Sequence, residues 1–227
     1  MVRRAAHILV LLLACACAFA APRQYADSAV YQGISMKVDV GNAAYQLIRS
    51  KGTIHQYEGA VSVNLLKRFY PLMEFGYMQA ADIAAGGSYA GLGGFTRIGL
   101  DINPLRKNRN SDYFLTVGVR AGFALQAYDQ RNINLNDPYW GTPLLNMHDP
   151  ARFDSWGEVV AGVQVKVAGG FHMGWAIRLH FLFTGSMGQY QPYYIPGYGC
   201  KDSNIFAFNY YLGWRWYPQP LRLEPEP

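Results

Sequence analysis

The chain has 227 residues, of which 51% are hydrophobic, 15% aromatic and only 15% charged. An ordinary soluble domain carries about 25% charged residues, so much of this chain is expected to face something other than water. The aromatic content excludes disorder for most of the chain. After the first twenty residues, no apolar run reaches the roughly 18 residues that a membrane helix needs. Two classes of protein therefore remain for this chain, a soluble β-protein and a transmembrane β-barrel.

The N-terminus predicts export. Arg3 and Arg4 precede an apolar stretch over 8–14, and Ala18-Phe19-Ala20 supplies a small-residue cleavage site. We therefore expect a signal peptide over 1–20 and an N-terminal periplasmic segment over 21–32. Lipidation at Cys15 is the alternative, because Leu12-Leu13-Ala14-Cys15 resembles a lipobox. Cleavage after Ala20 would leave Cys200 as the one cysteine, so the mature fold would have no intramolecular disulfide.

Eight segments alternate between apolar and polar residues with a period of two, which predicts strands. Between Tyr113 and Leu125, for example, every second residue is apolar and the intervening residues are small or polar. The eight predicted strands cover 33–48, 53–65, 71–79, 95–103, 113–125, 156–167, 173–183 and 206–216.

All charged residues of these strands share the face opposite the apolar one. That face is also rich in glycine, which weakens a solvent-exposed strand but leaves room for a large neighbour inside a narrow barrel. A lipocalin-type soluble barrel would also alternate, with the apolar face inward. The crowded polar face favours instead an all-β, eight-stranded antiparallel up-and-down transmembrane barrel with a polar, side-chain-filled lumen. Its predicted ion-pair network comprises Lys37, Asp39, Glu58, Glu74, Arg97, Asp101, Arg120, Glu158, Lys166, Arg178 and Arg215.

Connection lengths fit the same topology. Outer-membrane barrels alternate short periplasmic turns with longer extracellular loops. The connections after the second, fourth and sixth predicted strands are short, and those after the third, fifth and seventh are longer. We therefore expect a barrel over 33–217 with both termini in the periplasm of a Gram-negative bacterium. Residues 218–227 contain repeated prolines and are expected to form a disordered tail.

Over residues 33–217 the chain resembles the small eight-stranded outer-membrane barrels of the OmpA/OmpX type. It is also similar to an uncharacterised group of Gram-negative outer-membrane barrels that is described only as a domain of unknown function. Three runs carry the resemblance, namely Tyr70-Pro71-Leu72-Met73-Glu74-Phe75-Gly76-Tyr77, Arg97-Ile98-Gly99-Leu100-Asp101 and Tyr210-Tyr211-Leu212-Gly213-Trp214-Arg215-Trp216. The aromatic last strand is similar to the signal that the barrel-assembly machinery reads, although eleven residues follow Trp216. The resemblance implies no catalytic residue.

Candidate chemistry is sparse. The glycines at 86–94 lack the lysine of a phosphate loop and are expected to form a flexible loop. His148, Asp149 and Asp154 could hold a cation, but a solvated extracellular loop is favoured.

His180 shares the lumen face with Arg178 and is expected to join the internal network. His55 is the one candidate catalytic histidine, and no nearby serine and carboxylate are spaced to activate it. We therefore predict no catalytic residue, metal site or cofactor.

Two sets of loop residues suggest partners. Basic residues in the periplasmic turns could contact anionic phospholipid headgroups or simply keep the turns soluble, namely Lys67, Arg68, Arg106, Lys107 and Arg109. Aromatic residues of the long loops could pack on one another or contact an extracellular ligand, namely Tyr139, Trp140, Tyr190, Tyr193, Tyr194 and Tyr198. Outer-membrane lipid and the assembly machinery are the other expected partners, and nucleic acid is not implied. The favoured function is a non-enzymatic structural or adhesion-type barrel closed to ions, and the alternative is a lipid-modifying outer-membrane enzyme.

Overall fold

The computed structural model describes residues 30–44, 54–66, 68–84, 87–104, 113–134, 144–183, 192, 194–200 and 206–217. These residues contain one helical turn, at 41–44, and ten strands. The strands are β1 (Tyr31–Asp39), β2 (Ile54–Leu65), β3 (Phe69–Ala84), β4 (Gly87–Ile102), β5 (Tyr113–Asn134), β6 (Leu144–Ala168), β7 (Phe171–Leu182), β8 (Tyr194–Ile195), β9 (Gly199–Cys200) and β10 (Phe206–Trp216). Among the described residues, no helix has the length and apolar character needed to cross a membrane.

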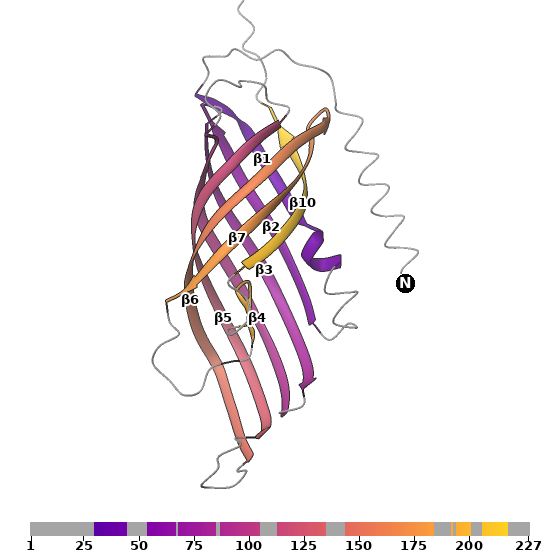
Figure 1. Cartoon of the computed structure of the whole chain (residues 1–227), viewed down its shortest axis with the longest axis vertical. Coiled ribbons are helices and arrows are strands. Elements are labelled where there is room, and N and C mark those ends of the chain that lie inside the picture. The colour runs from indigo at the N-terminus through magenta and orange to yellow at the C-terminus, as the bar shows by residue number, and fades with distance from the viewer. Residues whose placement is uncertain are drawn as a thin grey trace, which may run out of the picture.

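Eight of the strands form a closed antiparallel barrel (Figure 1). From β1 to β7 each strand pairs with the next along the chain, and β10 closes the ring by pairing with both β7 and β1. The closing register places Val38 opposite Leu212. The predicted eight-stranded, antiparallel, up-and-down barrel is confirmed.

The two ends of the barrel differ. β1 begins and β10 ends at one end, here called the terminal end, where β2, β4 and β6 also end and β3, β5 and β7 begin (Figure 1). The opposite end, here called the loop end, is uneven because β3 to β6 extend further than their neighbours. Pairing of β6 with β7 begins at Trp156, whereas its pairing with β5 continues to Leu144. A four-stranded sheet therefore projects beyond the ring at the loop end.

Several strands are longer than the sequence predicts. β4 begins at Gly87 rather than at 95, and β6 begins at Leu144 rather than at 156. The predicted flexible glycine loop is therefore wrong from Gly87 onward, and only residues 85 and 86 separate β3 from β4. The glycines of β4 make space for packing inside the barrel. A Cβ on Gly93 would lie 2.7 Å from Cβ of Gln126 and 2.8 Å from Cγ of Pro196.

The first strand is shorter than predicted, because β1 ends at Asp39 and residues 41–44 form the helical turn. The Asp39 Oδ1 atom accepts a hydrogen bond from the Asn42 backbone N–H at 3.1 Å, which satisfies a donor of the turn as a helix cap does. The rest of the predicted strand, 45–48, lies outside the described residues. At its other end β1 begins at Tyr31, so the barrel starts two residues before the predicted boundary.

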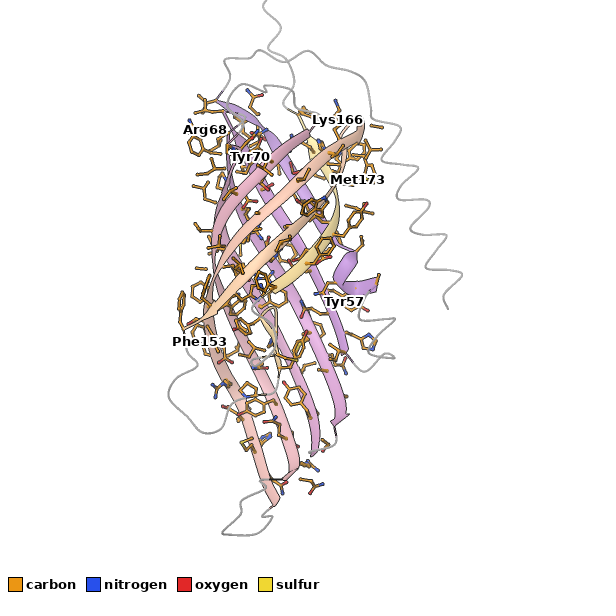
Figure 2. The ribbon with its side chains drawn as sticks, viewed as in Figure 1. Tyr57, Arg68, Tyr70, Phe153, Lys166 and Met173 are labelled. Atoms are coloured by element: carbon orange, nitrogen blue, oxygen red, sulfur yellow. The ribbon has the colours of Figure 1, made fainter. Side chains whose placement is uncertain are left out.

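The usual distribution of polarity is inverted in this barrel. Among the described residues, the buried side chains include 23 that are polar or charged and 13 that are hydrophobic. Large hydrophobic side chains cover the outside instead, and Phe206, Phe208 and Val119 are at least 60% exposed. Figure 2 shows Phe153 projecting away from the barrel wall. The barrel thus has a polar interior and an apolar exterior.

The apolar exterior forms a band around the barrel. Along β5 the outward positions from Leu115 to Ala127 are all apolar, which spans about 30 Å at a rise of about 3.3 Å per residue and a strand tilt of about 40°. Of the described residues that are exposed, the only lysines, arginines or carboxylates are Arg68 and Arg131. Arg68 lies at the terminal end (Figure 2), and Arg131 follows the band toward the loop end. Charge is therefore excluded from the band itself.

Candidate functional site

The centre of the barrel holds an ion-pair network, here called the central network, formed by Glu58, Glu74, Arg97, Asp101, Arg120, Glu158 and Arg178. These residues come from β2 to β7, where inward-pointing positions alternate with the apolar band. Arg97 contacts three carboxylates, with distances of 2.8 Å to Glu58, 3.0 Å to Glu74 and 2.7 Å to Glu158. Its side chain is 2% exposed.

Arg178 reaches the same three carboxylates from the opposite wall. Its guanidinium lies 3.0 Å from Glu58, 2.6 Å from Glu74 and 3.2 Å from Glu158. Arg97 and Arg178 thus share three glutamates between them. Residues separated by more than a hundred positions in the sequence are tied together at this point, so the network braces opposite sides of the barrel.

Arg120 extends the network toward the terminal end. It lies 3.0 Å from Glu74 and 3.1 Å from Asp101. Lys37 lines the same small cavity as Glu74, Asp101 and Arg120, and its ammonium lies 4.9 Å from the centre of the Tyr211 ring. With Lys37 included, four positive side chains face the four carboxylates of the central network. Charge balance of this kind is what allows ionised groups to remain buried.

The remaining predicted network residues lie outside this cluster. The Asp39 carboxylate accepts a hydrogen bond from the Asn209 side-chain amide. The Nε atom of Arg215 donates to Ser35 Oγ at 2.9 Å, and its guanidinium lies over the Tyr70 ring. Lys166 is half-buried, and it lies at the terminal end (Figure 2). The predicted inward face therefore holds one central cluster and separate polar groups around it.

A cavity of about 30 Å³ lies beside the central network. Its lining includes Glu58, Arg178 and Asn209. The Glu58 Oε2 and Asn209 Oδ1 atoms are buried and accept no hydrogen bond from the described protein groups. A water molecule needs about 10 to 15 Å³ of such volume, so the cavity has room for about two, and these two oxygens are acceptors for them.

The loop end of the interior is filled by a hairpin that the sequence reasoning missed. β8 and β9 pair through Ile195 and Gly199, and the hairpin lies within the outline of the barrel in Figure 1. The Arg97 Nη2 atom donates to the Gly197 carbonyl oxygen at 2.5 Å, which joins the hairpin to the central network. We call residues 194–200 the plug.

Hydrophobic side chains of the plug also face inward. Ile195 is 1% exposed and Tyr198 is 7% exposed, and both pack with Phe95, Ala124 and Trp156. The Trp156 indole N–H in turn donates to Glu158 Oε1 at 2.6 Å. A Pro-Gly pair at 196–197, which is typical of a tight turn, was the available sequence signal for this element.

The plug changes the interpretation of the loop aromatics. Tyr198 lies inside the barrel, so its assignment to an outer contact surface is wrong. Tyr194 is half-buried and packs against the cluster of Met78, Ala80, Tyr89 and Tyr128. The other four predicted members of this surface, Tyr139, Trp140, Tyr190 and Tyr193, lie outside the described residues, as do Lys67, Arg106, Lys107 and Arg109 of the basic turns.

The three residues considered for a cation do not converge. All lie in β6 rather than in a loop, which corrects the predicted loop conformation. Asp154 points inward and accepts a hydrogen bond from Gln126 Nε2 at 3.1 Å, whereas His148 is exposed. Asp149 accepts from the Ala151 backbone N–H. Within the described part of the chain, no group of three histidine, cysteine or acidic side chains could hold a metal ion.

The two candidate histidines differ in position. His180 is buried, and its Nδ1 atom donates to the Tyr198 carbonyl oxygen at 3.1 Å while Nε2 lies 3.7 Å from Glu158. His55 is exposed on β2, and its cross-strand neighbour on β3 is Gln79. An amide does not serve as a nucleophile. The register therefore places no nucleophilic side chain directly opposite His55 on β3.

An exposed ion pair marks the limit of the apolar band on β5. Arg131 Nη2 lies 2.6 Å from Asp129 Oδ2. The hydrogen bond from Arg131 holds the pKa of the Asp129 carboxyl below its ordinary value.

These features define a closed eight-stranded β-barrel with a charged, side-chain-filled interior and an internal plug. The chain belongs to the family described as "Domain of unknown function (DUF6048)", whose model matches residues 1–216. No curated protein is detectably similar to it in sequence. Among solved structures, the N-terminal β-barrel domain of Pseudomonas aeruginosa OprF is similar, with a TM-score of 0.42 and 12% sequence identity. That likeness covers 82% of this chain and 98% of the OprF domain.

Proposed function

We propose that this protein is a non-enzymatic barrel of the outer membrane of a Gram-negative bacterium. Its barrel spans the bilayer, its interior is closed to ions, and its loop end makes structural or adhesive contacts outside the cell. The inverted distribution of polarity is the observation that carries this proposal. A soluble barrel of the lipocalin type buries its apolar face, whereas this chain buries charge and exposes aromatic and aliphatic side chains.

The dimensions of the exterior support membrane insertion. The hydrocarbon core of a bilayer is about 30 Å thick, and transmembrane barrels carry an outward apolar band of about 25 Å. The estimated height of the band on β5 agrees with both values. Exposed aromatic side chains lie toward its two ends. Tyr57 and Tyr77 are paired on one side, and Tyr31 and Trp216 lie near the start of β1 and the end of β10 on the other. Such aromatic belts are typical of the interface between lipid and water.

The contents of the barrel interior support the proposal that the barrel is closed to ions. An eight-stranded barrel is only wide enough for side chains to fill it. Here the plug occupies the loop end and the central network occupies the middle. Arg215, Tyr70 and His172 are buried toward the terminal end. An ion crossing the barrel would have to displace all three layers.

The proposed orientation places the terminal end in the periplasm. An even number of strands returns the chain to the side on which it started, in agreement with the predicted export signal. Arg68 at this end would then lie near anionic headgroups of the inner leaflet, which attract a basic residue by about 1 kcal/mol. The aromatic strand β10 would be the segment that the assembly machinery recognises.

Fractionation of a Gram-negative host that expresses the whole chain tests the proposal. We expect the protein in the outer-membrane fraction, and we expect unboiled and boiled samples to migrate differently in SDS because a folded barrel resists the detergent. A soluble periplasmic protein with no such difference would contradict the proposal. Comparison of lipid masses between wild type and His55→Ala tests the enzymatic alternative, and we expect identical lipids.

A further inference from the structure

The plug is built around a tight turn. Pro196 and Gly197 occupy its two central positions, Gly197 has a φ of 76°, and the Tyr198 N–H donates to the Ile195 carbonyl oxygen at 3.1 Å. Proline followed by a residue with positive φ, closed by a hydrogen bond across four residues, defines a type II β-turn. The loop end of the barrel therefore contains a binding pocket that is filled by a peptide turn.

The polar contacts of this pocket are made to the peptide backbone. Arg97 and His180 donate to the carbonyl oxygens of Gly197 and Tyr198. The Gly197 N–H donates to Gln56 Oε1 at 3.4 Å, and the Tyr89 hydroxyl donates to the Tyr194 carbonyl oxygen at 2.9 Å. The side chains that make these hydrogen bonds come from β2, β4 and β7, so three strands of the barrel wall bind the backbone of the turn.

The apolar contacts add side-chain selectivity. Ile195 and Tyr198 fill the cluster around Phe95 and Trp156, and the rings of Trp156 and Tyr198 meet edge to face at 6.0 Å. A Cβ on Gly197 would lie 2.6 Å from the Phe95 ring. The pocket thus fits the order aliphatic, proline, glycine, aromatic.

We propose that this pocket is a binding site for a peptide β-turn of another protein, and that residues 195–198 occupy it in cis. Because the polar contacts go to backbone atoms, they do not require the turn to belong to the same chain. The ligand would enter at the loop end, so the inference extends the proposed contact function and rests on the same orientation. The plug then acts as a built-in competitor that keeps the pocket filled until a partner turn displaces it.

The strength of this competition can be estimated. A tethered ligand acts at an effective concentration of the order of millimolar. If the free turn binds the empty pocket with micromolar affinity, the plug weakens its apparent binding by at least ~100-fold. Wild type is therefore expected to bind an added turn poorly, and a chain without the plug is expected to bind it well.

The test uses the full chain in lipid vesicles, with residues 192–200 replaced by a nine-residue glycine-serine linker. The probe is a fluorescent, head-to-tail cyclic peptide of residues 192–200 that carries Cys200→Ser. The control probe carries Gly197→Ala in addition. We expect the plug-deleted chain to bind the probe at least ~100-fold more tightly than wild type does, and to bind the control probe no better than wild type binds the probe.

A plug-deleted barrel that is folded by its SDS migration and does not bind the probe would overturn the inference, and equal binding of the two probes would do the same. If the deletion does not fold, Gly197→Ala in the intact chain supplies the test, because it expels the turn from Phe95. Probe binding to that variant supports the inference, and its absence in the folded variant overturns it. A wild-type chain without SDS resistance would contradict the proposed membrane function instead. Failure of the membrane proposal can therefore be distinguished from failure of the peptide-binding proposal.

Discussion

Replacing Arg178 by methionine removes a charge from the central network while keeping most of the side-chain length. Arg178 contacts three glutamates at 2.6 to 3.2 Å. After the substitution Arg97 still contacts all three, but three positive side chains, Arg97, Arg120 and Lys37, must then balance the four carboxylates of the central network. Removal of one partner from a buried ion pair costs about 3 to 5 kcal/mol because the other charge remains uncompensated. We expect Arg178→Met to destabilise the barrel by that amount.

A second substitution separates charge balance from lost packing. Glu58 contacts Arg97 and Arg178, whereas Glu74 also contacts Arg120 and Glu158 also accepts a hydrogen bond from Trp156. Glu58→Gln therefore removes the charge of the glutamate that is held by fewer groups than the other two. The double variant Arg178→Met, Glu58→Gln should be more stable than the sum of the single variants predicts, by about 1 kcal/mol or more. Urea unfolding in lipid vesicles, followed by the SDS migration of the folded form, measures both values.

The matched control is Arg131→Met, which removes the same side chain from an exposed pair and should leave the unfolding midpoint unchanged. A cost below about 1 kcal/mol for Arg178→Met would be typical of a solvated surface pair and would refute the reasoning. Strict additivity of the two substitutions would also refute it.

Three further predictions concern the exterior, the first strand and the lumen. Val119→Arg places a charge in the apolar band and should cost about 2 to 4 kcal/mol if the residue meets the bilayer midplane, whereas Thr116→Ser should cost little; equal tolerance in a refolding titration would contradict the assigned faces. Asp39→Ala removes the carboxylate that accepts hydrogen bonds from Asn42 and Asn209. It should lower the free energy of unfolding in urea by about 1 to 3 kcal/mol, and an unchanged unfolding midpoint would show that these hydrogen bonds have no stabilising role. Planar-bilayer recording of wild type should give no stable conductance of porin size, and such a conductance would mean that the interior is a water-filled path.

The alternation of residues was sufficient to predict the barrel wall, because a period of two assigns each side chain to a face without knowledge of its neighbours. It placed the charged residues of the central network on one face. It did not predict which of them pair, since Glu74 and Arg178 are 104 residues apart and meet across the interior. That contact depends on the closure of the ring and the stagger of its strands.

Strand ends were predicted less well, and the reason is visible in β4. Gly91, Gly93 and Gly94 have low strand propensity and favoured a loop. The strand continues through them, and the missing side chains of Gly91 and Gly93 leave space for Tyr89 and for Pro196 of the plug. Likewise, the plug has two residues in each of its strands and shows no periodicity. Its stability comes from contacts with distant parts of the wall, which local sequence does not reveal.

The central claim is that the apolar band of this barrel contacts lipid. Spin labels at Val119→Cys and Arg131→Cys, each in a Cys200→Ser chain in lipid vesicles, test it on a single strand. We expect the label at 119 to collide with oxygen dissolved in the bilayer and to be shielded from a water-soluble nickel complex, and we expect the reverse for the label at 131. A label at 119 that is relaxed by the nickel complex as strongly as the label at 131 would contradict the account.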